Sequence, residues 1–503
     1  MLKLVYMTDL TCEREQFIRN ITENQFVCAA AGTGKTTVLV RRYLEILLSG
    51  AADCDQIIAI TFTDKAANEM KERVRSSILK NEAGLEPAKI ASLIERLNTA
   101  PISTVHGFCL RILRDNIGEL PFDPLFKICD ETAEALLRDQ FWQKFLERKI
   151  AERDPDLTIL INSITLAELS KLLDLIYEKQ AECAPILERY KNLNVTSHLA
   201  DIEKACRNYN LQLLYEYFSD KTISDIINQI STFKSSKSDD VLQRDFCIIL
   251  TASAEVLGRR QIPVSVRDGS LRKALGGGKK GTAAAWGNEL ETVREFHSQL
   301  AAKFRLIKDE FHTFDPEIEK LHADVMQSLA HLALDFLQEY RAEMRRKALL
   351  DFTGIELETE NLLARRSPEI VRYIRNFKHL LVDEFQDINP IQYRIIQLLQ
   401  ELNPDLITFF VGDEKQSIYR FRGAEVEIFN TLREQSDVQP LSINYRSVQA
   451  LMNFYNFFFA QFLGSTPPAE RYAAHYPLPI AAKDNSISTE PPVELLVIEE
   501  DEE

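Results

Sequence analysis

The stretch FVCAAAGTGKTT (residues 26–37) decides the fold, because it joins a short apolar run, a glycine-containing loop and the start of a helix. Small residues let backbone amides close on phosphate groups, and the following helix points its positive N-terminal end at them. Lys35 is expected to neutralise β- and γ-phosphates and Thr36 to ligate Mg²⁺. Ala29 stands at the first position of G-x-x-x-x-G-K-[ST], so the match is incomplete. The residues predicted to bind the nucleotide here are Ala31, Gly32, Thr33, Gly34, Lys35, Thr36 and Thr37.

An acidic pair supplies the second half of such a site. In LLVDEFQD (380–387) an apolar run ends in Asp383 and Glu384. Asp383 can hold Mg²⁺ directly or through water, and Glu384 can orient and deprotonate an attacking water. ATP and Mg²⁺ are therefore the predicted cofactors.

A third motif, VGDEKQSIYRFRGA (411–424), places the Gln416 amide where it could sense a γ-phosphate. Its run Tyr419-Arg420-Phe421-Arg422 offers aromatic faces for bases and cations for phosphates, as single-stranded nucleic acid requires. A buried role for Tyr419 and Phe421 in a hydrophobic core is the alternative.

Short apolar runs recur along the chain and predict an α/β fold with a parallel sheet covered on both faces. Ligands of such sheets bind at the carboxyl ends of the strands, where each motif falls. The runs are QFVCAA (25–30), QIIAITFT (56–63), HLLVDE (379–384), LITFFVGD (406–413) and QPLSINY (439–445).

Lys35 and Asp383 are 348 residues apart, far more than a minimal sheet domain needs, so an insertion is predicted. Helical spacing, as in Leu137, Phe141 and Phe145, indicates that it is a helical subdomain. Within it, LGGGKKGTAAAWG (275–287) is interpreted as a mobile surface loop rather than a phosphate site. The predicted domains are 1–120 and 351–435 for the two parts of the sheet domain, 121–350 for the insertion, and 436–503 for a hinge and the start of a second lobe.

Composition excludes few functions. The net charge of −16 over 503 residues argues against uniform coating of nucleic acid but leaves room for a local basic groove. Eight scattered cysteines without a CxxC pair favour reduced thiols over a disulfide or metal framework. No apolar run is long enough to span a membrane and no secretion signal is evident, so a cytoplasmic location is predicted.

Six motifs together resemble the UvrD/RecB/AddA-type superfamily 1 DNA helicases, and three of them are most similar to the AddA/RecB helicase-nuclease branch. The likeness runs from about residue 9 to 460. It implies a RecA-like P-loop NTPase domain, a second lobe with ATP between the two, and 3′ to 5′ movement along a DNA strand. The motifs are GTGKT, TFTDKAANEM, STVHGFC, VDEFQD, GDEKQSIYRFRGA and NYRS.

Carried over position by position, the resemblance implies that Gln16 reads the adenine edge, with Arg42 near the base and Tyr445 stacked on it. Arg446 would reach the γ-phosphate and stabilise charge in the transition state. KALLDFTGIE (347–356) resembles a further family element, although Thr353-Gly354 replaces the usual polar-acidic pair. The residues implied to contact DNA are Phe62, Thr63, His106, Tyr419, Phe421 and Arg422.

The later motifs of the second lobe and any GxxD…DYK-like nuclease signature are missing from the sequence. We therefore interpret the chain as the N-terminal piece of an ATP-dependent DNA helicase component of a double-strand-break repair helicase-nuclease, in which its partner is a second subunit. Alone it should bind ATP but hydrolyse it poorly. A second hypothesis is an ATP- and single-strand-binding scaffold or regulator without motor activity of its own. A small-molecule kinase explains fewer of the motifs.

Overall fold

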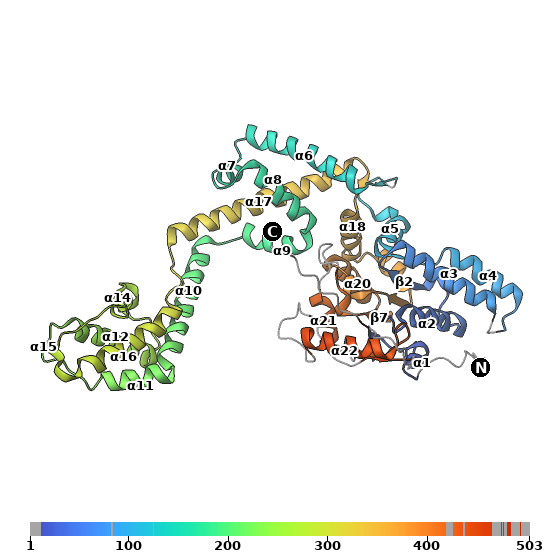
Figure 1. Cartoon of the computed structure of the whole chain (residues 1–503). Coiled ribbons are helices and arrows are strands. Elements are labelled where there is room, and N and C mark those ends of the chain that lie inside the picture. The colour runs from blue at the N-terminus through green and yellow to red at the C-terminus, as the bar shows by residue number, and fades with distance from the viewer. Residues whose placement is uncertain are drawn as a thin grey trace, which may run out of the picture. The chain divides into compact units, whose positions relative to one another are not determined.

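The structure is a computed structural model, shown in Figure 1. It describes residues 12–81, 84–123, 125–418, 426–435, 438–464 and 480–483, with single positions at 474, 476 and 493. Contact density divides the chain into two compact units, each described by itself below.

A six-stranded sheet forms the centre of the first unit, with strand order β3-β2-β6-β7-β1-β8. Every neighbouring pair is parallel, which confirms the predicted α/β class. Because all strands run the same way, their carboxyl ends meet at one edge, where ligands of such sheets bind. The strands are β1 (Gln25–Ala29), β2 (Ile57–Thr61), β3 (Ile102–Thr104), β6 (His379–Val382), β7 (Ile407–Gly412) and β8 (Val438–Leu441).

Five strands coincide with the five predicted apolar runs, whereas β3 was not predicted. It is three residues long, and only Ile102 is apolar and buried. Its register pairs Thr61 of β2 with Thr104. At the other edge the sheet extends to Leu441 in β8, inside the range predicted to be a hinge.

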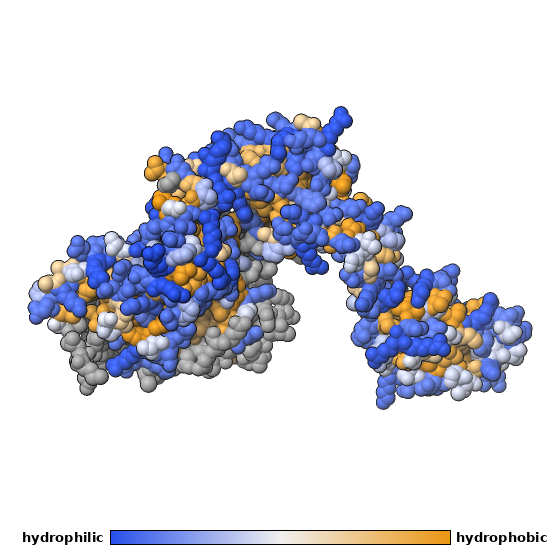
Figure 2. All heavy atoms as spheres, turned by 180° about the vertical axis from the view of Figure 1, so that it is seen from behind, coloured by the Kyte–Doolittle hydropathy of each residue, from blue (hydrophilic) through white to orange (hydrophobic). Residues whose placement is uncertain are grey.

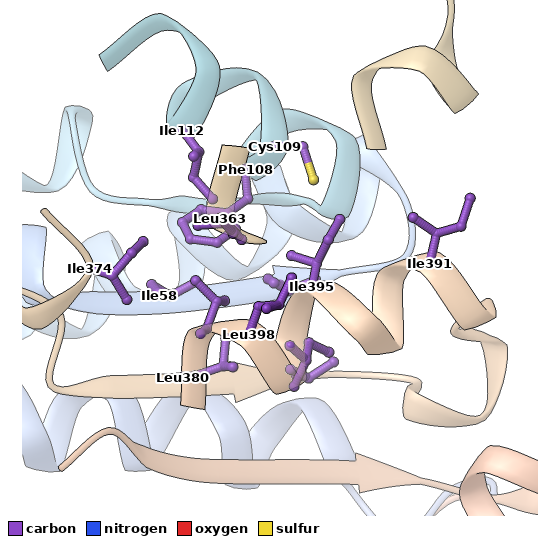
Figure 3. Packing of buried hydrophobic residues seen from close by; sticks show 14 of the residues in the cluster. Ile58, Phe108, Cys109, Ile112, Leu363, Ile374, Leu380, Ile391, Ile395 and Leu398 are labelled. Carbon is purple, nitrogen blue, oxygen red and sulfur yellow. The ribbon is translucent and has the colours of Figure 1, made fainter. Parts of the chain in front are cut away.

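Alternating residues of the strands point to opposite faces of the sheet and pack in two separate hydrophobic cores. On one face, Ile58 and Leu380 pack with Phe108 and Leu398, as Figure 3 shows. On the other face, strand residues such as Phe409 pack with the first helices of the chain. Covering both faces explains why these strands are apolar throughout rather than alternating.

Helices cover the sheet and continue into the second unit. Those packed around the sheet are α1 (Cys12–Arg19), α2 (Lys35–Ser49), α3 (Asp64–Lys80), α4 (Pro87–Asn98), α5 (Val105–Asp115), α18 (Phe352–Ala364), α19 (Pro368–Arg375), α20 (Pro390–Leu402) and α21 (Val426–Gln435). The helices between α5 and α18 are α6 (Glu131–Ala151), α7 (Pro155–Ile161), α8 (Leu166–Glu178), α9 (Gln180–Lys191), α10 (Val195–Ser219), α11 (Lys221–Ile230), α12 (Val241–Arg259), α13 (Val264–Arg267), α14 (Ser270–Ala274), α15 (Ala283–Trp286), α16 (Leu290–Ile307) and α17 (Pro316–Arg346).

Shorter elements complete the described chain. Two small parallel sheets pair β4 (Lys127–Ile128) with β5 (Leu349–Leu350), and β9 (Ile443–Asn444) with β10 (Ala481–Ala482). Helix α22 (Gln449–Leu463) follows β9. The 3-10 helices are η1 (Cys54–Gln56), η2 (Ile117–Glu119), η3 (Gly287–Glu289), η4 (Phe385–Asp387) and η5 (Glu414–Gln416).

The second unit is narrower than the insertion predicted at 121–350. It consists of Lys149–Leu169 and Ile186–Leu334, while Ser170–Pro185 groups with the sheet. Its core is formed from α10 to α16, around residues such as Phe246 and Trp286. The helical character of the insertion follows from the apolar spacing that predicted it.

The loop at 275–287 was expected to be mobile, and the structure anchors it instead. The Lys280 ammonium donates to Asp245 Oδ2 at 2.7 Å and to the Ala274 carbonyl at 3.1 Å. Arg294 donates to the Lys280 and Gly281 carbonyls at 2.9 and 3.0 Å. These contacts cap the short helix α14 and hold the loop against α16.

Among the residues that the structure describes, no helix combines the length and apolar character needed to cross a bilayer. Figure 2 shows a largely hydrophilic face on which hydrophobic residues form separate patches.

Candidate functional site

The phosphate loop connects β1 to α2 in a conformation that requires glycine. Gly32 and Gly34 have φ angles of 77° and 87°, in the left-handed region that side chains disfavour. Thr33 is fully buried, and its hydroxyl donates to the Ala30 carbonyl at 2.7 Å. Arg14 from α1 donates to the Thr33 carbonyl, and a Cβ at Gly34 would meet its guanidinium. Ala31 is exposed at the tip, while Thr36 and Thr37 are half-buried in the first turn of α2.

Lys35 at the start of α2 reaches the acidic pair that follows β6. Its ammonium lies 2.5 Å from Glu384 Oε2, and it is 8% exposed. Glu384 has a φ of 51°, which turns the chain sharply after Asp383. Two halves of the site that lie far apart in sequence are therefore in direct contact.

The acids after β6 hold more negative charge than Lys35 alone balances. Burial, with the negative charge of Glu384 as the second cause, raises the pKa of Asp383 to about 6 and that of Asp387 to about 7. Asp387 Oδ1 is buried without a hydrogen-bond partner in the described part of the chain. A cation beside these carboxylates would relieve both conditions, so the residues fit Mg²⁺.

The described residues contain no group of three or more His, Cys, Asp or Glu side chains placed to bind a metal ion. This is compatible with Mg²⁺, which usually takes one or two carboxylates and completes its shell with phosphate oxygens and water.

Gln386 links the acids to the next strand. Its amide nitrogen donates to Glu384 Oε2 at 2.9 Å, and its oxygen accepts from the Asp413 backbone amide at 2.9 Å. Asp413 in turn accepts from Gln416 Nε2 at 2.6 Å. A continuous chain of hydrogen bonds therefore runs from Lys35 to Gln416.

The segment after β8 lies directly on the phosphate loop. Asn444 Nδ2 donates to the Ala31 carbonyl at 2.7 Å, and the Tyr445 backbone amide donates to the Gly32 carbonyl at 2.8 Å. The Arg14 guanidinium stacks 3.4 Å from the centre of the Tyr445 ring. Arg446, the residue predicted to contact the γ-phosphate, is exposed next to the phosphate loop. Tyr445 and Arg446 therefore both lie beside the loop that precedes Lys35.

Gln16 and Arg42 are close in the fold but differ in accessibility. Gln16 is exposed on α1, where a ligand can reach it from solvent. Arg42 is fully buried and donates to the Phe17 and Asn20 carbonyls at 2.6 Å each. Because its guanidinium donates to carbonyls at the end of α1, Arg42 stabilises the segment that contains Gln16.

Three of the residues implied to contact DNA directly follow the carboxyl ends of β2 and β3. Phe62 and Thr63 follow β2, and Thr63 caps α3 by accepting from the Ala66 amide at 3.1 Å. His106 lies in the first turn of α5, directly after β3, with a side chain 35% exposed. Tyr419, Phe421 and Arg422 lie outside the described residues.

A basic stretch lies within the second unit, although acidic residues elsewhere in that unit balance it. Residues 259–308 contain eleven Lys or Arg and four Asp or Glu, a local net charge of +7. Arg267, Arg272 and Lys308 line a cavity of about 520 Å³ together with Glu203 and the aromatic rings of Phe304 and Phe311. This stretch is the part of the second unit whose charge suits phosphate groups.

Sequence reasoning missed several residues that the geometry brings into the site. Gln386 and Asp387 stand within the quoted acidic motif, and Asn444 within NYRS, so their position was available as a signal. Arg14 lies two positions before Gln16, but nothing in its local sequence indicates that it would reach the Thr33 carbonyl.

A phosphate loop, an acid pair and the Gln416 amide at one edge of a parallel sheet define a P-loop nucleotide-binding protein. The UvrD/REP helicase N-terminal domain model matches residues 10–437, and the chain belongs to this family. This confirms the helicase family inferred from the motifs.

Curated relatives share a name that describes them as the A subunit of an ATP-dependent helicase/nuclease. Those of Clostridium kluyveri and Pediococcus pentosaceus are 28% and 29% identical over 88% and 90% of this chain, covering 38% and 39% of their own lengths. That of Latilactobacillus sakei is 28% identical over 87% of this chain and 53% of its own length. The chain thus spans from somewhat over a third to about half of the relatives it matches.

Proposed function

We propose that the chain is an ATP-dependent DNA helicase component that binds Mg²⁺ and ATP at the carboxyl edge of its sheet. It would move 3′ to 5′ along a DNA strand as part of a helicase-nuclease acting in double-strand-break repair. The hydrogen-bond chain from Lys35 through Glu384, Gln386 and Asp413 to Gln416 carries this proposal. It connects the groups that would hold the γ-phosphate, activate the attacking water and sense the γ-phosphate.

Each residue has a role set by its place in that unit. Lys35 would hold the β- and γ-phosphates, and Thr36 with Asp383 would hold Mg²⁺, which supplies neutralisation of phosphate charge. Glu384, released from Lys35 by the bound triphosphate, would orient and deprotonate water. Arg446 would stabilise charge on the phosphoryl group in transfer.

On the adenosine side, Gln16 would read the adenine edge and Tyr445 would stack on the base. Arg42 would act indirectly, by fixing the end of α1 that carries Gln16. The remaining loop residues would supply backbone amides for the phosphates.

The DNA side is supported by two observations. Phe62, Thr63 and His106 follow adjacent strands, which would place them along one path for a single strand across the sheet edge. The +7 charge of residues 259–308 would attract the phosphate backbone of DNA. Because the relatives are named for one lettered subunit of a helicase/nuclease, a second subunit would be the partner. A cytoplasmic location is part of the same proposal.

The test is ATP hydrolysis by the purified chain with and without a single-stranded oligonucleotide, with Lys35→Ala as background. Stimulation by DNA would support a motor. ATP and DNA binding with turnover only after addition of a second polypeptide would support the alternative, a nucleotide-gated scaffold. Absence of ATP binding would overturn both.

A further inference from the structure

A single buried carboxylate joins three elements of the first unit. Glu356 in α18 is 3% exposed. Its Oε1 accepts from Gln392 Nε2 at 2.6 Å and lies 3.0 Å from His106 Nε2, while its Oε2 accepts from Asn389 Nδ2 at 3.1 Å. A buried carboxylate is stable only with such donors, so these positions are mutually dependent.

Two of the donors fix the start of α20. Asn389 is the N-cap of this helix and accepts from the Gln392 backbone amide at 2.8 Å. The Gln392 side chain accepts in return from the Asn389 amide at 3.4 Å. Glu356 therefore holds both side chains of the capping box.

The start of α20 is also the end of the acidic loop of the nucleotide site. The 3-10 helix η4 (Phe385–Asp387) and Ile388 separate Glu384 from Asn389. A displacement of the capping box must therefore be transmitted to the turn that presents Glu384 to Lys35.

The third contact of Glu356 faces the predicted path of DNA. His106 lies directly after β3, and its ring is 5.0 Å from that of Phe352, edge on. The His106 side chain is 35% exposed, and its Nε2 lies 3.0 Å from Glu356 Oε1. A ligand that moves the exposed part of His106 would change this contact with Glu356.

We infer that Glu356 is a positioning residue that couples DNA contact at His106 to the ATP site through Asn389 and Gln392. The inference rests on the proposed function and adds to it the route between the two ligands. Loss of the His106 contact would leave Glu356 with its donors Asn389 and Gln392, shift the start of α20 and so reorient Glu384.

The experiment measures thermodynamic coupling in the full chain. The affinity of a fluorescent ATP analogue is determined with and without saturating single-stranded oligonucleotide, and the ratio is the coupling factor. We expect about fivefold or more for the unmodified chain, and a factor near one for Glu356→Gln with each ligand's separate affinity changed less than about twofold.

Glu358→Gln is the matched control, since Glu358 lies on the same helix, is 4% exposed, and pairs with Arg345 at 2.5 Å instead of with His106. It should keep the coupling factor. If Glu356→Gln does not fold, Gln392→Leu replaces it, because it removes a donor to Glu356 Oε1 and leaves His106 unchanged, and the same loss of coupling is expected.

Three results would overturn the inference while leaving the proposed function intact. These are ligand binding without coupling in the unmodified chain, full coupling in Glu356→Gln, and equal loss in Glu358→Gln. Failure of the unmodified chain to bind ATP or DNA would instead overturn the proposed function, and the inference with it.

Discussion

The Lys35 ammonium lies 2.5 Å from the Glu384 carboxylate although 349 positions separate them in sequence. Each is the other's counterion in a site where Asp383 and Asp387 already carry raised pKa values. A triphosphate with Mg²⁺ offers Lys35 a stronger anionic partner and offers the acids a cation. We therefore expect nucleotide binding to exchange partners at this pair, which frees Glu384 when ATP arrives.

Lys35→Ala should lower affinity for a fluorescent ATP analogue by about 100-fold or more, because it removes the charge-assisted contact to the phosphates. Lys378→Ala is the control, since the Lys378 side chain is exposed and its ammonium donates to the Ala51 carbonyl at 3.1 Å, away from the phosphate loop. Unchanged affinity in Lys35→Ala, measured by fluorescence titration, would remove the phosphate-loop assignment.

Glu384→Gln should keep ATP binding and lower hydrolysis by ~10²–10⁴-fold, because the amide cannot accept a proton from water. Lys35 retains an oxygen partner in this variant, so folding should be little affected. Phosphate release under saturating ATP measures the effect. Undiminished turnover would point to Asp387, whose Oδ1 is buried and unpartnered in the described part of the chain, as the next base to test.

The sequence was sufficient for the parts of the fold that rest on continuous apolar runs. Five strands and the meeting of Lys35 with the acidic motif follow from strand order in parallel sheets, where motifs converge at one edge. Strand β3 was not predicted, because three residues with a single buried apolar side chain carry no periodic signal.

Roles that depend on long-range side-chain contacts could not be predicted. The burial of Arg42 depends on carbonyls of α1 and the following turn, and the position of Glu356 depends on donors from α5 and α20. The sequence around Lys280 predicts a mobile loop, because its partner Asp245 lies 35 residues away on α12 and cannot be identified from local sequence. In each case the local sequence identifies the residue but not the distant side chain or carbonyl that it contacts.

Arg42→Met should destabilise the first unit by ~3 kcal/mol, because it leaves the Phe17 and Asn20 carbonyls without their buried donor. Gln16→Ala should leave stability unchanged and reduce the preference for ATP over GTP. Thermal unfolding and competition binding separate the two effects. A stable Arg42→Met protein with reduced ATP affinity would instead make Arg42 a direct contact of the base.

His379 should make stability depend on pH. Burial, with the nearby charge of Arg42 as the second cause, lowers the pKa of His379 to about 4, and its Nδ1 has no partner among the described residues. The unfolded chain takes up the proton first, near pH 6.5, so stability is complete above that value and falls as pH decreases to about 4.

The loss should be on the order of 3 kcal/mol and absent in His379→Leu. Urea unfolding followed by Trp142 fluorescence, in a Trp286→Phe background, reports on the unit that contains His379, because these are the two tryptophans of the chain. His322→Gln, at an exposed position, should keep the full pH dependence. An identical pH profile in His379→Leu would contradict the assignment.

The basic stretch at residues 259–308 predicts a salt-dependent contribution to DNA binding. Arg272→Glu combined with Lys279→Glu reverses two exposed charges within residues 259–308. Affinity for DNA should fall similarly for all sequences, and the slope of log affinity against log salt should decrease by about 1 for each phosphate that the variant no longer neutralises. Lys80→Glu combined with Lys89→Glu, two exposed charges on α3 and α4 of the first unit, is the control for net charge alone. An equal effect of this control would mean that binding responds to total charge rather than to a contact surface at residues 259–308.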